Sequence, residues 1–217
     1  MNPYILQNLS FFSLMVPVVV AMFLHRRLSR VLMVFAFYLV VSLFSSLLNA
    51  YLALHKIHNL WASNLFMPIQ FGILAYFFSF QVGNSFRRLV NWAIPSFLFL
   101  WSINFLLFES IFTFSTYAKP MEYLLLTLIA GFALLTNYRR NLHSPTTDPL
   151  FWIDTGVMLY FSSVAVLFSL SSSLLKMSSE TLRVAFSAQA LISIVVNLSF
   201  AAGILCLRRQ STYSGQP

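Results

Sequence analysis

The chain has 217 residues, of which 59% are hydrophobic and 8% are charged. Soluble domains carry roughly 25% charged residues, so this chain cannot coat a water-facing surface and must be solvated largely by lipid. Its net charge of +8 arises from small basic clusters at the ends of apolar runs. That placement favours contact with a lipid bilayer and its anionic headgroups and argues against nucleic-acid binding. The single Cys206 supplies no disulfide framework.

Seven apolar runs of membrane length follow one another along the chain. We predict spans at about 4–24, 31–54, 60–80, 89–108, 120–138, 149–170 and 182–207, then a short polar, disordered tail at 208–217. The first run is longer than the core of a signal peptide and has no basic residue before it, so it is expected to be a retained span, kinked at Pro17. The predicted fold is one all-α domain, a polytopic seven-transmembrane-helix bundle.

Local signals mark the starts of two spans. Asp148 precedes Pro149, which places a capping acid before a proline at the first helical position. Pro120 and Glu122 indicate the same arrangement for the fifth span, which leaves Lys119 in the preceding loop.

The orientation of the bundle follows from the distribution of lysine and arginine. The first, third and fifth connections and the tail hold nine of these residues, whereas the N-terminus and the other connections hold four. The side richer in basic residues is expected to be cytoplasmic. We therefore predict an N-terminus outside, a cytoplasmic C-terminus and a multi-pass location in the cell inner membrane.

Polar residues within the spans are the natural place to look for a site, because they are costly in lipid and usually face the bundle interior. Span 2 carries a stripe at three- and four-residue spacing, as does span 7, and in span 3 Pro68 leaves the Asn64 carbonyl without its helical donor. The candidate residues of an outer pocket are Asn49, Asn64, Gln70, Glu122, Gln189 and Asn197. The simpler interpretation is that such residues join helices by interhelical hydrogen bonds.

Two acids in the spans have a structural explanation as well as a functional one. Glu122 and Asp154 each lie near the start of a helix, where an acid compensates the helix dipole. A ligand or proton role at the outer mouth of span 5 is the alternative for Glu122.

Catalytic and cofactor chemistry finds little support in the sequence. His55 and His58 lie outside and cannot join the cytoplasmic His25 and His143 to reach the three or four ligands of a zinc site. All lysines fall in predicted loops, which excludes a retinal Schiff base, and no nucleophile, phosphate-binding or C-x-x-C motif occurs. We predict no metal, no cofactor and no enzymatic activity.

Two stretches resemble a family of short, uncharacterised bacterial seven-span proteins: NLWASNLFMPIQFGILAYFF in span 3 and PLFWIDTGVMLYFSSVAVLFSL in span 6. Together they cover about a fifth of the chain. Such proteins look like stand-alone relatives of the membrane sensor parts of histidine-kinase systems, which implies a sensory or accessory role. The family motif in span 3 often has a carboxylate where this chain has Gln70, and this difference argues against a proton-coupled role there.

We therefore expect a non-enzymatic sensory or signalling-accessory protein of the inner membrane. It would detect its stimulus through the outer half of the bundle and pass a helix shift to a membrane partner, such as a histidine kinase or another signalling protein. The alternative is a small-solute transporter or channel, with the polar stripes lining a path and Pro68 at a hinge. A third hypothesis is an intramembrane lipid enzyme that uses Glu122 with a histidine. A homo-oligomer is compatible with each.

Overall fold

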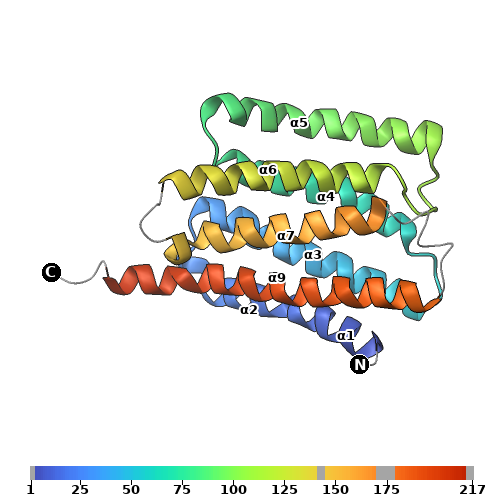
Figure 1. Ribbon diagram of the computed structural model, residues 1–217, viewed down its shortest axis with the longest axis horizontal. Coiled ribbons are helices and arrows are strands. Elements are labelled where there is room, and N and C mark those ends of the chain that lie inside the picture. Colours follow the sequence, from blue (N-terminus) through green and yellow to red (C-terminus); the bar gives the residue numbers. More distant parts are fainter. Residues whose placement is uncertain (1–2, 141–144, 170–178, 214–217) are drawn as a thin grey trace.

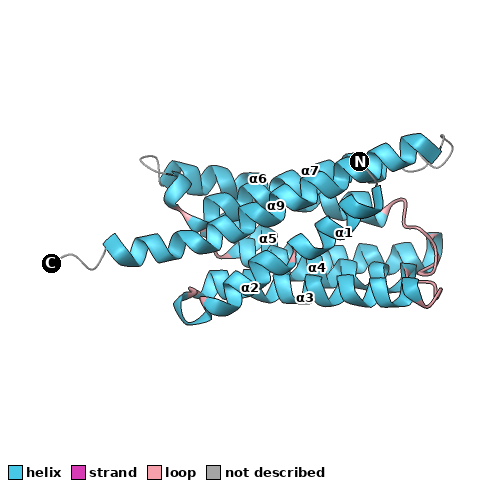
Figure 2. Ribbon diagram, turned by 90° about the horizontal axis from the view of Figure 1, so that it is seen from below, coloured by secondary structure: helices cyan, strands magenta, loops and turns pink. Residues whose placement is uncertain are grey.

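A computed structural model describes residues 3–140, 145–169 and 179–213, and its elements within these ranges are all helical. Seven of its helical segments are long and apolar enough to cross a membrane, which confirms the predicted all-α seven-helix bundle. The segments run side by side along the long axis, with connections at both ends and the two chain termini at opposite ends (Figures 1 and 2). The elements are α1 (Pro3–Ser13), α2 (Met15–Phe23), η1 (His25–Arg27), α3 (Arg30–Leu54), α4 (Leu60–Ser79), α5 (Asn84–Ile103), η2 (Asn104–Phe108), α6 (Ala118–Arg140), η3 (Pro145–Thr147), α7 (Pro149–Ser169) and α9 (Ser179–Tyr213).

The helices pack in a defined order around an aromatic core. Helix α7 lies between α6 and α9, while α4 contacts α3, α5 and α6. Helices α1 and α2 pack on α9, and α1 has little contact with α3. The largest fully buried side chains include six phenylalanines: Phe35, Phe71, Phe77, Phe78, Phe97 and Phe161. This order leaves a space between α1 and α3 that backbone packing does not close.

The first span is two helices rather than one. Helix α1 ends at Ser13 and α2 begins at Met15, so the break falls four to two residues before Pro17. Proline has no N–H to donate to the carbonyl four residues earlier, and its ring clashes with that carbonyl. The backbone N–H of Leu14 instead bonds the Phe11 carbonyl three residues back, at 3.3 Å. The predicted kink thus corresponds to a local interruption of the helical hydrogen bonds at Leu14, near the middle of the span, where the backbone angles remain helical.

The end of the last span differs from the prediction. Helix α9 continues to Tyr213, whereas the sequence predicts a disordered tail from residue 208. Arginine and glutamine, which occupy positions 208–210, are good helix formers. Residues 208–213 therefore extend the helix, and the rest of the predicted tail lies outside the described residues.

Helices α7 and α9 approach each other closely at two glycines. A Cβ atom on Gly203 would lie 2.8 Å from the backbone oxygen of Pro149 and 3.1 Å from Trp152 Cβ. A Cβ atom on Gly156 would lie 2.7 Å from the Phe200 ring. Small residues let membrane helices pack at short range, so these glycines set the spacing of the two helices.

We expect Gly203→Ala to destabilise the bundle by about 1–3 kcal/mol, because the added methyl group must displace backbone rather than a mobile side chain. Gly72→Ala on α4 is the matched control. Nothing lies within 4 Å of its Cβ position, and alanine favours helix over glycine by about 1 kcal/mol. Unfolding of both variants in bicelles measures the difference, and equal stability of the two would contradict the close α7–α9 contact.

Candidate functional site

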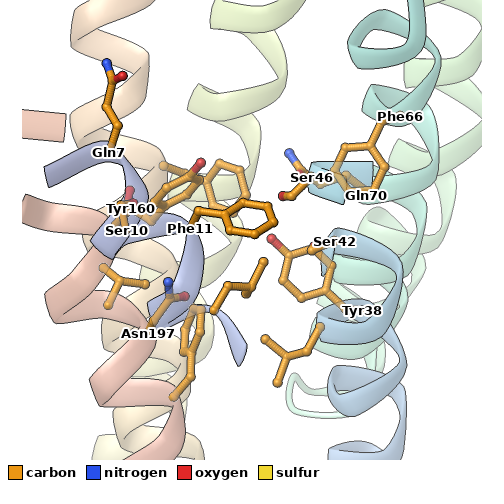
Figure 3. Close-up of a pocket in the computed structure, with 16 residues that line it drawn as sticks. Gln7, Ser10, Phe11, Tyr38, Ser42, Ser46, Phe66, Gln70, Tyr160 and Asn197 are labelled. Carbon is orange, nitrogen blue, oxygen red and sulfur yellow. The ribbon is translucent and has the colours of Figure 1, made fainter. Parts of the chain in front are cut away.

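A cavity of about 320 Å³ lies between the N-terminal helices and the rest of the bundle. Five helices contribute to it, and Figure 3 shows Ser10 and Asn197 on one side with Tyr38 and Ser42 on the other. Its lining residues are Gln7, Ser10, Phe11, Leu14, Tyr38, Leu39, Ser42, Ser46, Phe66, Gln70, Tyr160, Phe161, Ser193, Val196, Asn197 and Phe200.

The cavity lies at the middle of the bundle rather than in its outer third. One lining residue from each of five spans falls within one residue of that span's midpoint: Leu14, Ser42, Gln70, Tyr160 and Ser193. Leu14 is also the residue at which span 1 breaks. This cavity therefore lies at mid-depth, beside the helix break, and not at the level of the predicted outer pocket.

The lining is polar but carries no charged side chain. Hydroxyl and amide groups alternate with the rings of Phe11, Phe66 and Phe161. The Ser42 hydroxyl is buried without a well-formed hydrogen bond among the described residues, and it interacts with the Tyr38 side chain. Polar groups at this depth need a partner, so the cavity suits water or a small uncharged molecule with both polar and apolar parts.

The two polar stripes predicted from the sequence face each other across this cavity. Ser42 and Ser46 come from span 2, and Ser193 and Asn197 come from span 7. Asn197 also donates to the Ser13 hydroxyl at 2.8 Å and so holds α9 against the end of α1.

Of the six predicted site residues, the cavity lining includes two, Gln70 and Asn197. Asn49 lies one turn beyond the cavity, where its amide donates to the Ser45 carbonyl of its own helix at 2.8 Å. Gln189 likewise lies one turn beyond Ser193, and its backbone carbonyl accepts a hydrogen bond from the Ser193 hydroxyl at 2.9 Å. Both are on the predicted helices but at the wrong depth for this cavity.

Asn64 holds a loop instead of lining the cavity. Its amide donates to the carbonyls of Ile111 and Thr113 at 2.8 and 2.9 Å, which fixes the loop between η2 and α6. Its own carbonyl, released by Pro68, accepts the Trp101 indole N–H at 3.2 Å. The predicted free acceptor is therefore occupied by a neighbouring helix.

Glu122 is buried opposite the middle of α4 rather than placed at an outer mouth. It is 1% exposed, and its carboxyl accepts a hydrogen bond from the Gln70 amide at 3.1 Å. The prediction that Lys119 lies in a loop is wrong, because it belongs to the first turn of α6 and is 5% exposed. Its ammonium donates to the Ser63 hydroxyl at 2.9 Å and lies 5.8 Å from the ring centroid of Phe114.

Asp154 belongs to a separate polar link near the other end of the bundle. The Asn137 amide donates to Asp154 at 2.8 Å and to Gln81 at 2.6 Å. All three side chains are buried, and they join α7, α6 and the end of α4. This arrangement is a buried interhelical connection, and it does not contribute to the cavity.

Glu109 organises the loop that Asn64 holds. Its carboxyl accepts hydrogen bonds from Asn104 at 2.7 Å, from Ser115 at 2.8 Å and from the Thr116 backbone N–H at 2.6 Å. Partial burial alone raises the pKa of Glu109, but the hydrogen bonds from Thr116, Asn104 and Ser115 outweigh it and hold the pKa below its ordinary value of 4.5. Glu109 thus holds together the loop that leads into α6.

Three polar lining residues belong neither to the six candidates nor to the polar stripes of spans 2 and 7: Gln7, Ser10 and Tyr160. Gln7 and Ser10 occupy one face of span 1 at a three-residue spacing, the same signal that marks the stripes on spans 2 and 7. Tyr160 lies within the aromatic end of the span 6 motif. His55 and His58 are both exposed at the connection between α3 and α4.

Neither a protein-family model nor a curated protein nor a solved structure matches this chain.

The loop held by Glu109 should loosen in acid. Because the folded pKa lies below the unfolded one, the stabilisation is fully present above about pH 4.5 and is lost as the pH falls through the lowered value. Hydrogen bonds to a charged group contribute about 1.5 kcal/mol or more. Amide exchange at Thr116 and Tyr117, corrected for intrinsic rates, should therefore accelerate about tenfold in acid.

Glu109→Gln should show this faster exchange already at pH 7, while Glu180→Gln on α9 should leave it unchanged. Equal protection of Thr116 at pH 7 and at pH 3 in the unaltered protein would contradict the role given to Glu109.

The polar link at Asp154 should be sensitive to loss of its central amide. Asn137→Leu removes two buried hydrogen bonds, to Asp154 and to Gln81, and should cost about 1–3 kcal/mol. Thr136→Val is the control, since that hydroxyl donates only to the Phe132 carbonyl of its own helix, and its effect should stay within about 0.5 kcal/mol. Unfolding titrations in bicelles compare the two, and a neutral Asn137→Leu would show that the link contributes nothing.

Proposed function

We propose that the protein binds a small, uncharged molecule in its mid-depth cavity and acts as a non-enzymatic sensory or signalling-accessory component of the cell inner membrane. The observation that carries the proposal is the cavity itself, with hydroxyl and amide groups facing aromatic rings at the centre of five spans. Ligand sites in proteins have volumes of about 300–1,000 Å³ and combine apolar walls with a few polar groups. This cavity fits the lower end of that description.

The arrangement of the helices supports a role in signalling. The occupant would touch α3 on one side and α1 and α9 on the other, although α1 and α3 contact each other little. Binding would therefore change the separation of elements that are otherwise weakly connected. A ligand shifts a conformational equilibrium only by its differential affinity for the two states. Here the two states would differ in the separation of α1 and α3, so a ligand that touches both would bind them with different affinity. A membrane partner, such as a histidine kinase, would receive the shift.

Transport of a small solute is the second candidate, and the break in span 1 favours it specifically. Many transporters bind their substrate near the bilayer midplane at discontinuous helices. Here the break at Leu14 is part of the lining of a mid-depth cavity. The two candidate functions share a binding site and differ in whether the bound solute crosses the membrane.

Ser193→Leu tests the shared binding site. It fills part of the cavity, and Ser199→Leu is a matched control on the same helix. Both hydroxyls donate to the backbone carbonyl four residues back, at 2.9 and 3.0 Å, and both residues are half-buried, but only Ser193 lines the cavity. We expect saturable binding of 4-fluorobenzyl alcohol in nanodiscs, followed by ¹⁹F NMR, to weaken at least about tenfold in the Ser193→Leu variant only, because the enlarged side chain occupies the site.

The same variants separate signalling from transport. A sensory protein should cross-link to a signalling protein in native membranes, with a yield that Ser193→Leu alters and Ser199→Leu does not. A transporter should carry phenyl glucoside, which is uncharged and does not cross lipid, into proteoliposomes. Uptake that Ser193→Leu abolishes would replace the sensory proposal with transport.

A further inference from the structure

Gln70 and Asn197 are the two buried amides that line the cavity, and the NH₂ group of each donates a hydrogen bond to another side chain. The Gln70 amide nitrogen donates to Glu122, and the Asn197 amide nitrogen donates to Ser13. These are the hydrogen bonds that the two side chains make among the residues the structure describes. Their carbonyl oxygens are therefore left as acceptors beside the cavity. Serine and tyrosine hydroxyls can donate or accept. The two amide carbonyls can only accept, so they decide whether the cavity prefers a molecule that donates a hydrogen bond.

The orientation of the Gln70 amide depends on Glu122. A carboxyl oxygen that accepts selects the NH₂ branch of the amide and turns the carbonyl branch away from itself. Glu122 is buried and is not among the lining residues, so it acts on the cavity through Gln70. Lys119, three residues earlier on α6, is buried too and interacts electrostatically with Glu122.

We infer that Glu122 is a positioning residue that presents the Gln70 carbonyl oxygen to the cavity, and that the natural occupant is an uncharged molecule that donates a hydrogen bond to it. A hydroxyl or N–H group beside an apolar group is the chemistry required, since the same cavity carries phenylalanine rings. The inference rests on the cavity being a binding site, as proposed above. It adds the class of molecule and the residue that selects it.

Two isomeric probes test this selection. 4-Fluorobenzyl alcohol and 4-fluoroanisole have the same atoms, but the alcohol alone has an O–H donor. We expect the protein in nanodiscs to bind the alcohol at least about tenfold more tightly in ¹⁹F NMR titrations, with protein-free nanodiscs as background, because the anisole would leave the buried carbonyl unpaired.

Two variants separate the acceptor from the residue that orients it. Gln70→Met removes the carbonyl at similar volume and should bring the ratio of the two affinities close to one. Glu122→Gln lets the Gln70 amide turn over and should lower the ratio at least about threefold without weakening anisole binding. A merely structural role for Glu122 would weaken both probes together. If Glu122→Gln does not fold, Gln70→Met alone decides whether the Gln70 carbonyl is the acceptor that selects the occupant.

Each outcome has a distinct meaning. Equal saturable binding of both isomers, abolished by Ser193→Leu, would overturn the donor preference while the cavity stands as a site. A tenfold ratio that persists in Gln70→Met would overturn the part assigned to Gln70 and Glu122. Binding that survives Ser193→Leu, or saturable binding of neither isomer, would overturn the proposed function and this inference with it.

Discussion

Inside a bilayer a polar side chain has no water to bond, so each one must find a partner within the bundle or line a cavity. This constraint accounts for the placement of most polar groups in the protein. The Asn64 amide NH₂ donates to the loop carbonyls of Ile111 and Thr113, and Lys119 donates to Ser63. At the opposite end Asn137 joins Gln81 to Asp154. The two ends of the bundle are thus tied by polar links, and the middle is where polar groups gather around a space.

The sequence predicts the number and approximate limits of the spans, because apolar runs of membrane length have few other uses. It also predicts the polar stripes, since helical periodicity places Ser42 with Ser46 and Ser193 with Asn197 on single faces. The depth at which two stripes meet depends on helix order and axial offset, which one chain does not contain. For that reason Gln70 and Asn197 line the cavity, whereas Asn49 lies a turn beyond it.

Local rules also fail where tertiary contacts supply a partner from elsewhere in the chain. Pro68 frees the Asn64 carbonyl as expected, but Trp101 from another helix occupies it. Lys119 precedes a proline and reads as a loop cation, yet Ser63 and the rings of Phe114 and Phe168 give it a buried environment. The hydrogen-bonding partner lies 37 residues away for Asn64 and 56 residues away for Lys119, beyond the reach of helix-capping or periodicity arguments.

The distribution of these links bears on what the cavity can do. Helices α4, α6, α7 and α9 form a continuous series of contacts, reinforced by Asn137 and by the close approach at Gly203. The first span packs mainly on α9, and the cavity separates its first half, α1, from α3, which α2 contacts. A molecule in the cavity would bridge a connected part of the bundle and a segment already interrupted by Pro17. Because interrupted helices bend more readily than continuous ones, the response to binding should concentrate in the first span, whether its purpose is to signal to a partner or to open a path.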